Sequence, residues 1–562
     1  MKTLLKGGIV VSGGGSAQLD VLVDGEKIER VAEYISCAEA NVVDVTGKLL
    51  FPGFIDAHTH FDLDVCNTTT ADNFDTGTRS AIRGGTTMVI DFACPNKGES
   101  LQYGLDLWHK KADGRSSCDY SFHMTIDDWN DEIKAEVPRM FEQGISSFKM
   151  YMTYPAMMIG DKDLFYALEE IKKFGGIAGV HCENAGVIDA LIEQHKADGK
   201  FVPGSHPECR PNATEAEAVA HLLRICEVAD TPVVIVHLST KEALAEVMAA
   251  RARGQKVYVE TCPHYLTLDE SGYYEKDFRK AAGYICAPPL RTKEDQKALW
   301  KGLYNGAIQT VSTDHCSFTL EQKKAGRGDF TKIPGGLPGV ETRGVLLYTF
   351  GVATGRITKE KMAEVLSENP AKLYGAWPRK GAILAGSDAD IVVYDPEADT
   401  TIRGEDMISE AKYTPYEGMR TRGSIAQVYL RGKLAVEHGE VKVGAAGTFI
   451  PRTTGTLYDV FIRKGASLAF REAPFMARMN YLQSAAVSCA IMSSSLVGMT
   501  QTVTLESGVE MMASSPRVLF FSGSILMPRY SRPSQMEARI VAEFSPTPAV
   551  KTRQSRPPST VV

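Results

Sequence analysis

The sequence predicts a (β/α)8 barrel with a small β-sandwich built from both flanks of the barrel segment. Between about residues 51 and 375, short apolar stretches alternate with helix-like stretches, as they do in repeated βα units of a parallel sheet. Before and after this region, short alternating segments with turns are typical of antiparallel β structure. The number of βα units favours a closed barrel over an open doubly wound sheet.

This pattern divides the chain into four segments. Residues 1–50 and 376–452 are expected to form the two parts of the sandwich, 51–375 the barrel, and 453–562 a tail. Barrel strands are expected around GFIDAHTH and over 86–93, 145–152, 176–181, 231–239, 255–262 and 308–315. Helices are expected over 166–174, 214–229 and 241–254. The tail is rich in serine and methionine, has weak periodicity and is expected to be disordered.

Composition excludes several classes of partner. The net charge of -7 gives no reason to expect nucleic acid. No apolar run reaches the roughly 18 residues that a membrane span needs. The eleven cysteines are scattered without CxxC pairs, which indicates free thiols in a reducing compartment, and therefore the cytoplasm.

The stretch GFIDAHTHFD places His58 and His60 one residue apart. Side chains two residues apart on a strand point to the same face, so both imidazoles can reach one metal ion. An isolated HxH also fits two polar residues on a solvated strand face, so the rest of the chain must decide.

Other polar residues end the predicted strands. In a (β/α)8 barrel the catalytic groups lie at the C-terminal ends of the strands. Besides the two histidines, these positions hold Lys149, His181, His237 and Asp314. Each alone also fits a structural role, such as a hydrogen-bonded histidine or a helix cap. Together they indicate zinc or a similar divalent metal, and more than four such groups indicate two ions about 3.5 to 4 Å apart.

Lys149 does not fit this set as an ordinary lysine. An ammonium with a pKa of about 10.4 is repelled by metal cations. A carboxylate at this position would instead bridge two ions, so the sequence indicates that Lys149 is modified.

The spaced motifs of the chain resemble those of a known family. They are GFIDAHTHFD, ISSFKMYMTYP, VHCEN, VVIVHLST, ICAPPLR, STDHCSF and NPAKLYG. This set is similar to the hydantoinase and dihydropyrimidinase family of cyclic amidohydrolases, over residues 1 to about 452. The resemblance implies a zinc-dependent hydrolase that opens dihydropyrimidines or 5-substituted hydantoins to N-carbamoyl amino acids. It also implies a homo-oligomer, a tetramer or a dimer.

The resemblance implies roles for individual residues. Lys149 would react with carbon dioxide to give N6-carboxylysine, which bridges two zinc ions. His58, His60 and Asp314 would hold one ion, and His181 and His237 the other. Asp314 would act as general base and then general acid. Tyr154, five residues after the lysine, would stabilise the oxyanion.

The expected substrate pocket departs from the family at two positions. Ala287 stands where serine is frequent, and Gly335 where asparagine is frequent. Leu63, Tyr151 and Met158 match positions that line the pocket for the exocyclic substituent, although ordinary packing explains them equally well. The sequence therefore does not choose between dihydropyrimidines and hydantoins, nor between stereoisomers.

Two alternatives remain open. Dihydroorotases and allantoinases usually carry an arginine shortly after HxH, whereas Phe61, Asp62 and Leu63 follow here. A non-catalytic scaffold like the collapsin response mediators would have lost metal ligands, whereas all six positions are intact.

The tail, residues 453–562, is either a genuine appended segment or the product of a frameshift or readthrough. The composition break at the family's usual end favours the second, so truncation after Arg452 is expected to leave activity intact.

Overall fold

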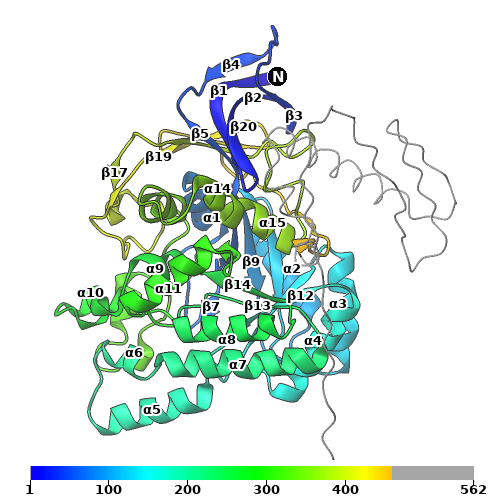
Figure 1. Cartoon of the computed structure of the whole chain (residues 1–562). Helices are drawn as coiled ribbons and strands as arrows, with labels where there is room; N and C mark the ends of the chain where they lie inside the picture. The colour runs from blue at the N-terminus through cyan, green and yellow to red at the C-terminus, as the bar shows by residue number, and fades with distance from the viewer. Residues whose placement is uncertain (1, 458–562) are drawn as a thin grey trace, which may run out of the picture. The chain divides into compact units, whose positions relative to one another are not determined.

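Eight parallel strands form the predicted barrel in the computed structural model, which describes residues 2–457 (Figure 1). Each strand pairs with the next along the chain, from β6 through β9 to β15. A parallel bridge between Thr59 and His315 brings the end of the last strand beside the first, so the barrel is nearly closed. The strands are β6 (Phe54–Thr59), β9 (Thr86–Ala93), β10 (Asp119–Thr125), β11 (Ser147–Tyr151), β12 (Ile177–His181), β13 (Val233–Ile235), β14 (Val257–Thr261) and β15 (Thr310–Val311).

Helices follow the strands and cover the barrel from outside (Figure 1). The α-helices are α1 (Phe74–Arg83), α2 (Leu101–Ala112), α3 (Asp131–Glu142), α4 (Asp161–Lys173), α5 (Ala185–Ala197), α6 (Ser205–Glu208), α7 (Asn212–Ala229), α8 (Lys241–Ala252), α9 (Pro263–Thr267), α10 (Phe278–Ala282), α11 (Lys293–Tyr304), α12 (Leu320–Lys324), α13 (Arg343–Leu347), α14 (Lys359–Ala363) and α15 (Asn369–Leu373). Shorter 3-10 and π turns are η1 (Glu270–Tyr274), η2 (Phe330–Lys332), η3 (Tyr348–Val352), η4 (Glu364–Glu368) and η5 (Gly404–Asp406). Several helices begin at a capping side chain: Thr292 and Asp295, for example, form a reciprocal capping box at α11. No helix among residues 2–457 is long and apolar enough to cross a membrane.

The two flanks of the barrel join in one mixed sheet of nine strands. They are β1 (Lys2–Ser12), β2 (Gly15–Asp24), β3 (Lys27–Ala32), β4 (Asn41–Asp44), β5 (Leu49–Pro52), β16 (Ile391–Asp395), β19 (Ser424–Leu430), β20 (Lys433–Glu437) and β21 (Glu440–Val441). The antiparallel pairing of β5 with β16, which sets Leu50 opposite Val393, connects the two flanks. The predicted fold class, a barrel with a β unit drawn from both flanks, is thereby confirmed. Two small two-stranded sheets complete the strands: the hairpin of β7 (Asp64–Val65) with β8 (Thr68–Thr69), and the antiparallel pair of β17 (Thr400–Thr401) with β18 (Arg420–Thr421).

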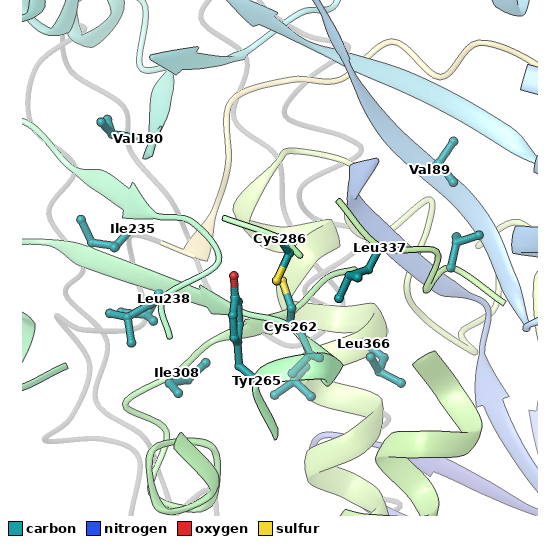
Figure 2. Packing of buried hydrophobic residues seen from close by; sticks show 14 of the residues in the cluster. Val89, Val180, Ile235, Leu238, Cys262, Tyr265, Cys286, Ile308, Leu337 and Leu366 are labelled. Carbon is teal, nitrogen blue, oxygen red and sulfur yellow. The ribbon is translucent and has the colours of Figure 1, made fainter. Parts of the chain in front are cut away.

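The core between strands and helices is apolar because the parallel strands are buried on both faces. All eight residues of β9 are buried, which explains why its sequence, TTMVIDFA, does not alternate. Figure 2 shows part of this core, where Cys262 and Cys286 lie beside the ring of Tyr265. The hydroxyl of Tyr265 is also satisfied, because it donates to the Pro288 carbonyl at 2.6 Å.

The chain packs on the barrel slightly beyond the predicted boundary at Arg452. The Thr453 N–H donates to the Gly375 carbonyl at 3.2 Å, and the Thr456 N–H to the Lys372 carbonyl at 2.8 Å. Leu457 is buried in a core cluster. Residues 453–457 therefore pack with the barrel, and the rest of the predicted tail lies outside the described residues.

Candidate active site

A cavity of about 410 Å³ lies at the C-terminal ends of the barrel strands. Its lining contains all six predicted metal positions, namely His58, His60, Lys149, His181, His237 and Asp314. They come from the ends of β6, β11, β12, β13 and β15 or from the residues that follow directly. The barrel therefore brings the six side chains to one place, as their positions at strand ends predicted.

Asp314 lies between the two histidines of the HxH motif. Its Oδ1 is 3.2 Å from His58 Nε2 and 3.1 Å from His60 Nε2. Burial by itself would raise the pKa of Asp314, but the neighbouring imidazoles hold that pKa well below its usual range. The carboxylate is therefore ionised at neutral pH.

These donor groups fit a divalent metal ion. One ligand atom from each of His58, His237 and Asp314 lies within 4.8 Å of the others. His60 Nδ1 and His237 Nδ1 are buried without a hydrogen-bond partner, and buried polar atoms rarely stay unpaired. Burial lowers the pKa of His60 to about 4 and that of His237 well below its usual value. Their imidazoles are therefore neutral, the form that binds metals.

Carboxylates orient two of the histidines from behind. His58 Nδ1 lies 2.6 Å from Glu260 Oε1, and His181 Nε2 lies 2.7 Å from Glu183 Oε2. A carboxylate at one ring nitrogen fixes the proton there and leaves the other nitrogen free for a metal. Sequence analysis missed both carboxylates, although Glu260 lies near the end of the strand predicted over 255–262 and Glu183 stands two residues after His181.

Lys149 is buried on β11 with its Nζ 5.0 Å from the centre of the Phe92 ring and 4.9 Å from that of Tyr151. Burial lowers the pKa of its ammonium to about 8, although Asp314 and Glu260 oppose the shift. Roughly a tenth of the amine is therefore unprotonated at pH 7, far more than for a lysine with an ordinary pKa.

Three site residues have left-handed backbone conformations. The φ angles are 68° for Tyr154, 38° for His237 and 49° for Asp314. Residues other than glycine rarely adopt such angles, and when they do they cluster at functional sites. The folded barrel therefore holds these three side chains in place at a conformational cost.

Tyr154 lies over His181, with the two ring centres 5.1 Å apart. The guanidinium of Arg210, which donates to Glu183 at 2.6 Å, lies 5.6 Å from the Tyr154 ring centre. Burial raises the pKa of Tyr154 above its usual value, in spite of the opposing arginine. The phenol therefore keeps its proton and can donate a hydrogen bond. Arg210 is a further cavity residue that sequence analysis missed.

Most of the predicted substrate residues also line the cavity. Leu63, Tyr151, Ala287 and Gly335 are on its wall. Met158 is not: 37% of it is exposed, and Met157 lines the cavity in its place. The Tyr154 carbonyl accepts hydrogen bonds from both methionine N–H groups, so a tight turn decides which side chain faces inward.

Comparison with known proteins agrees with the fold and the site. The model of the amidohydrolase family matches residues 49–435. A D-hydantoinase of Streptomyces coelicolor is 42% identical over 461 residues, 81% of this chain and 98% of its own length. A D-phenylhydantoinase of Escherichia coli is 40% identical over 438 residues, 77% of this chain and 94% of its own.

Solved structures agree as well. The crystal structure of dihydropyrimidinase from Brevibacillus agri has a TM-score of 0.80 at 40% identity, covering 81% of this chain and 99% of that one. The L-hydantoinase from Arthrobacter aurescens has a TM-score of 0.74 at 31% identity, covering 80% and 99%.

The fold and the strand-end cluster define a barrel hydrolase, and the matches show that the chain belongs to the amidohydrolase family. Within that family it belongs with the hydantoinases and dihydropyrimidinases, as the sequence motifs predicted.

Proposed function

We propose that this enzyme hydrolyses the cyclic amide bond of 5-substituted hydantoins or dihydropyrimidines and releases N-carbamoyl amino acids. The observation that carries the proposal is the cavity itself, in which the donor atoms of His58, His237 and Asp314 converge beside Tyr154. The D-hydantoinases that match over nearly their full length support the same substrate class.

Two divalent ions, zinc in the first instance, would be held by His58, His60 and Asp314 and by His181 and His237, with Lys149 shared. When bound, such ions supply Lewis acidity that makes hydroxide available at neutral pH. The unpaired imidazole nitrogens of His60 and His237 support this assignment.

Lys149 would bridge the ions as N6-carboxylysine. Its unprotonated amine attacks carbon dioxide, a C–N bond forms and a proton is lost, which leaves a carbamate in place of a repelled cation. The lowered pKa of about 8 supports this reaction, because only the neutral amine is nucleophilic.

Asp314 and Tyr154 would act on the amide bond that is hydrolysed. Asp314 accepts a proton from the attacking water and returns it to the leaving ring nitrogen, as a base and then an acid. Tyr154 donates a hydrogen bond to the amide oxygen as this oxygen gains negative charge. Backbone groups of Ala287 and Gly335 and the side chains of Leu63 and Tyr151 would contact the ring and its substituent.

Two further expectations concern the cellular compartment and the oligomeric state of the enzyme. The ten cysteines within residues 2–457 are all free thiols, which supports a reducing compartment and hence the cytoplasm. The family resemblance supports a homo-oligomer, a tetramer or a dimer.

The first experiment compares kcat/KM for dihydrouracil and 5-phenylhydantoin, with zinc-loaded protein and bicarbonate. We expect turnover of at least one ring and, for Tyr154→Phe, a kcat about 100-fold lower with KM little changed. Tyr166→Phe, an exposed tyrosine on α4, is the matched control. A protein that retains no metal and opens neither ring would instead be a non-catalytic scaffold.

A further inference from the structure

Lys323, on the short helix α12, is fully buried although no role in the reaction requires it. Within residues 2–457 no carboxylate pairs with it, and the ionisable groups near it are the thiols of Cys66, Cys286 and Cys316. Enclosing a lysine without a counter-charge is costly. The contacts of the Lys323 ammonium must therefore offset the cost of its burial.

The Lys323 ammonium joins two segments of the cavity wall. Its Nζ donates to the Ile285 carbonyl at 3.1 Å and to the Pro334 carbonyl at 2.8 Å. Ile285 stands two residues before Ala287, and Pro334 directly precedes Gly335. The buried ammonium therefore ties together the two backbone segments that face the ring in the proposed function.

Gln322, the preceding residue, ties the same helix to a third part of the wall. Its Nε2 donates to Thr68 Oγ1 at 2.9 Å and to the Thr69 carbonyl at 2.8 Å. These threonines form β8 of the hairpin whose other strand, β7, follows Leu63, and Thr70 pairs with Leu63 through backbone and side chain. Leu63 lines the cavity on the side assigned to the substituent.

The next lysine on α12 has no such contact. Lys324 is on the solvent side and pairs with Glu321 at 2.9 Å. The two adjacent lysines therefore differ in what they join, and Lys324 is a natural control for Lys323.

We propose that α12 is a positioning element for the substrate: Lys323 sets the spacing of the two ring-facing segments, and Gln322 sets the hairpin that faces the exocyclic substituent. This inference rests on the proposed function for the identity of the substrate. Neither side chain needs to touch the substrate, because a small shift of a positioning segment is sufficient to change reaction geometry.

Lys323→Met keeps the length and apolar stem of the side chain and removes the donors. We expect KM to rise about tenfold for both dihydrouracil and 5-phenylhydantoin, with kcat within about threefold and zinc content unchanged. Lys324→Met should leave both constants as they are. An unchanged KM in a folded Lys323→Met protein, or equal effects of the two lysine variants, would overturn the proposal.

Gln322→Glu tests the second half, because it keeps the oxygen that accepts from the Thr319 N–H at 2.7 Å in the capping box of α12 and removes the Nε2 donor. We expect a higher KM for 5-phenylhydantoin, by about fivefold, and no change for dihydrouracil, which lacks the substituent. Equal effects on both substrates would contradict separate control of ring and substituent.

Amide hydrogen exchange gives a readout that does not depend on substrate. Exchange should accelerate over 285–287 and 334–336 in Lys323→Met, and over 63–70 in Gln322→Glu, with Lys324→Met like the parent protein. If the parent protein opens neither ring, the proposed function fails while the exchange data still decide whether α12 holds these segments. Unchanged exchange in both variants would refute the positioning role.

Discussion

At the scale of single residues, the histidines work through groups that sequence motifs do not reveal. Glu260 contacts His58 from a strand 202 residues further along the chain, and is fully buried with Oε2 unpartnered. A buried carboxylate at Nδ1 both fixes the imidazole proton and raises the basicity of the other nitrogen. Metal affinity should therefore depend on Glu260 as well as on the ligands.

Glu260→Gln tests this dependence. The amide keeps the shape of the side chain but removes the charge, so we expect metal affinity to fall about 10- to 100-fold. The measurement is metal content by mass spectrometry after dialysis against increasing chelator. Glu246→Gln, an exposed change on α8, is the control. Retention equal to the parent protein would show that Glu260 only fills space.

The sequence predicted those site residues whose positions follow from the local pattern of the chain. His58 and His60 share one strand, and Lys149, His181, His237 and Asp314 follow apolar runs, so their convergence could be inferred from a barrel. Glu260 was missed because its role is a contact across the fold. Lys323 was missed because EQKKAG reads as an exposed helix.

At the scale of elements, the segment around Gly336 must approach its neighbours closely. The Gly336 N–H donates to the Ile285 carbonyl at 2.9 Å, and the Cys316 N–H to the Leu337 carbonyl at 3.2 Å. Gly336 has a φ of 152°, and a Cβ there would lie 2.2 Å from the Cys316 carbonyl oxygen. A Cβ on Gly335 would meet nothing within 4 Å.

Gly336→Ala should therefore destabilise the protein, whereas Gly335→Ala should not. We expect a loss of about 2 kcal/mol in the free energy of unfolding for the first, because both backbone strain and a clash oppose the new methyl group. Denaturant titration of the two variants at equal metal content measures the difference. Equal stability would mean that the segment shifts freely to accept the side chain.

Element prediction succeeded where periodicity was strong. The helix expected over 214–229 is α7 (Asn212–Ala229), and the strand expected over 86–93 is β9. The short α12 and the hairpin β7–β8 were not predicted, since five-residue helices and two-residue strands carry no periodic signal. Of these two segments only the hairpin reaches the cavity, through Val65 and the turn residue Cys66.

At the scale of the whole described molecule, a buried ion cluster connects the barrel to the nine-stranded sheet. Lys380 contacts Asp119 of β10, and it lies 2.8 Å from Asp390 and 3.0 Å from Asp388 next to β16. Asp388 also pairs with Lys27 at 2.6 Å and Arg379 at 3.0 Å. Burial would raise the pKa of Asp388, but these cations outweigh it and lower the pKa to about 2.

Asp388→Asn should therefore cost stability in a pH-dependent way. The folded pKa lies below the unfolded value of about 3.9, so the stabilising contribution is complete above about pH 5 and disappears as pH falls towards 2. We expect a loss on the order of 2 kcal/mol at pH 7. The difference in the free energy of unfolding between the metal-free parent and variant proteins should narrow by about half from pH 7 to pH 3. The exposed Asp198→Asn serves as control, and a pH-independent gap would contradict the ionic origin.

Two truncations test whether the fold needs residues 453–457. Residues 453–457 bury Leu457 and pair with Gly375 and Lys372, so removal of residues 453–562 should lower the free energy of unfolding by about 2 kcal/mol. Removal of residues 458–562 should change neither this quantity nor kcat/KM, because 81% of this chain is sufficient to cover 98% and 99% of two matched relatives.

The two truncations also test the expectation that a chain ending at Arg452 remains active. Arg452 is buried and donates to Ser121 Oγ at 2.8 Å and to the Tyr374 carbonyl at 2.9 Å, and a chain end placed directly on it would bring a carboxylate to this interior site. Thermal unfolding and kcat/KM at 25 °C, measured for both truncations beside the full chain, distinguish the cases. A loss of activity on removal of 458–562 alone would mean that this segment contributes to the enzyme and is not an addition to it.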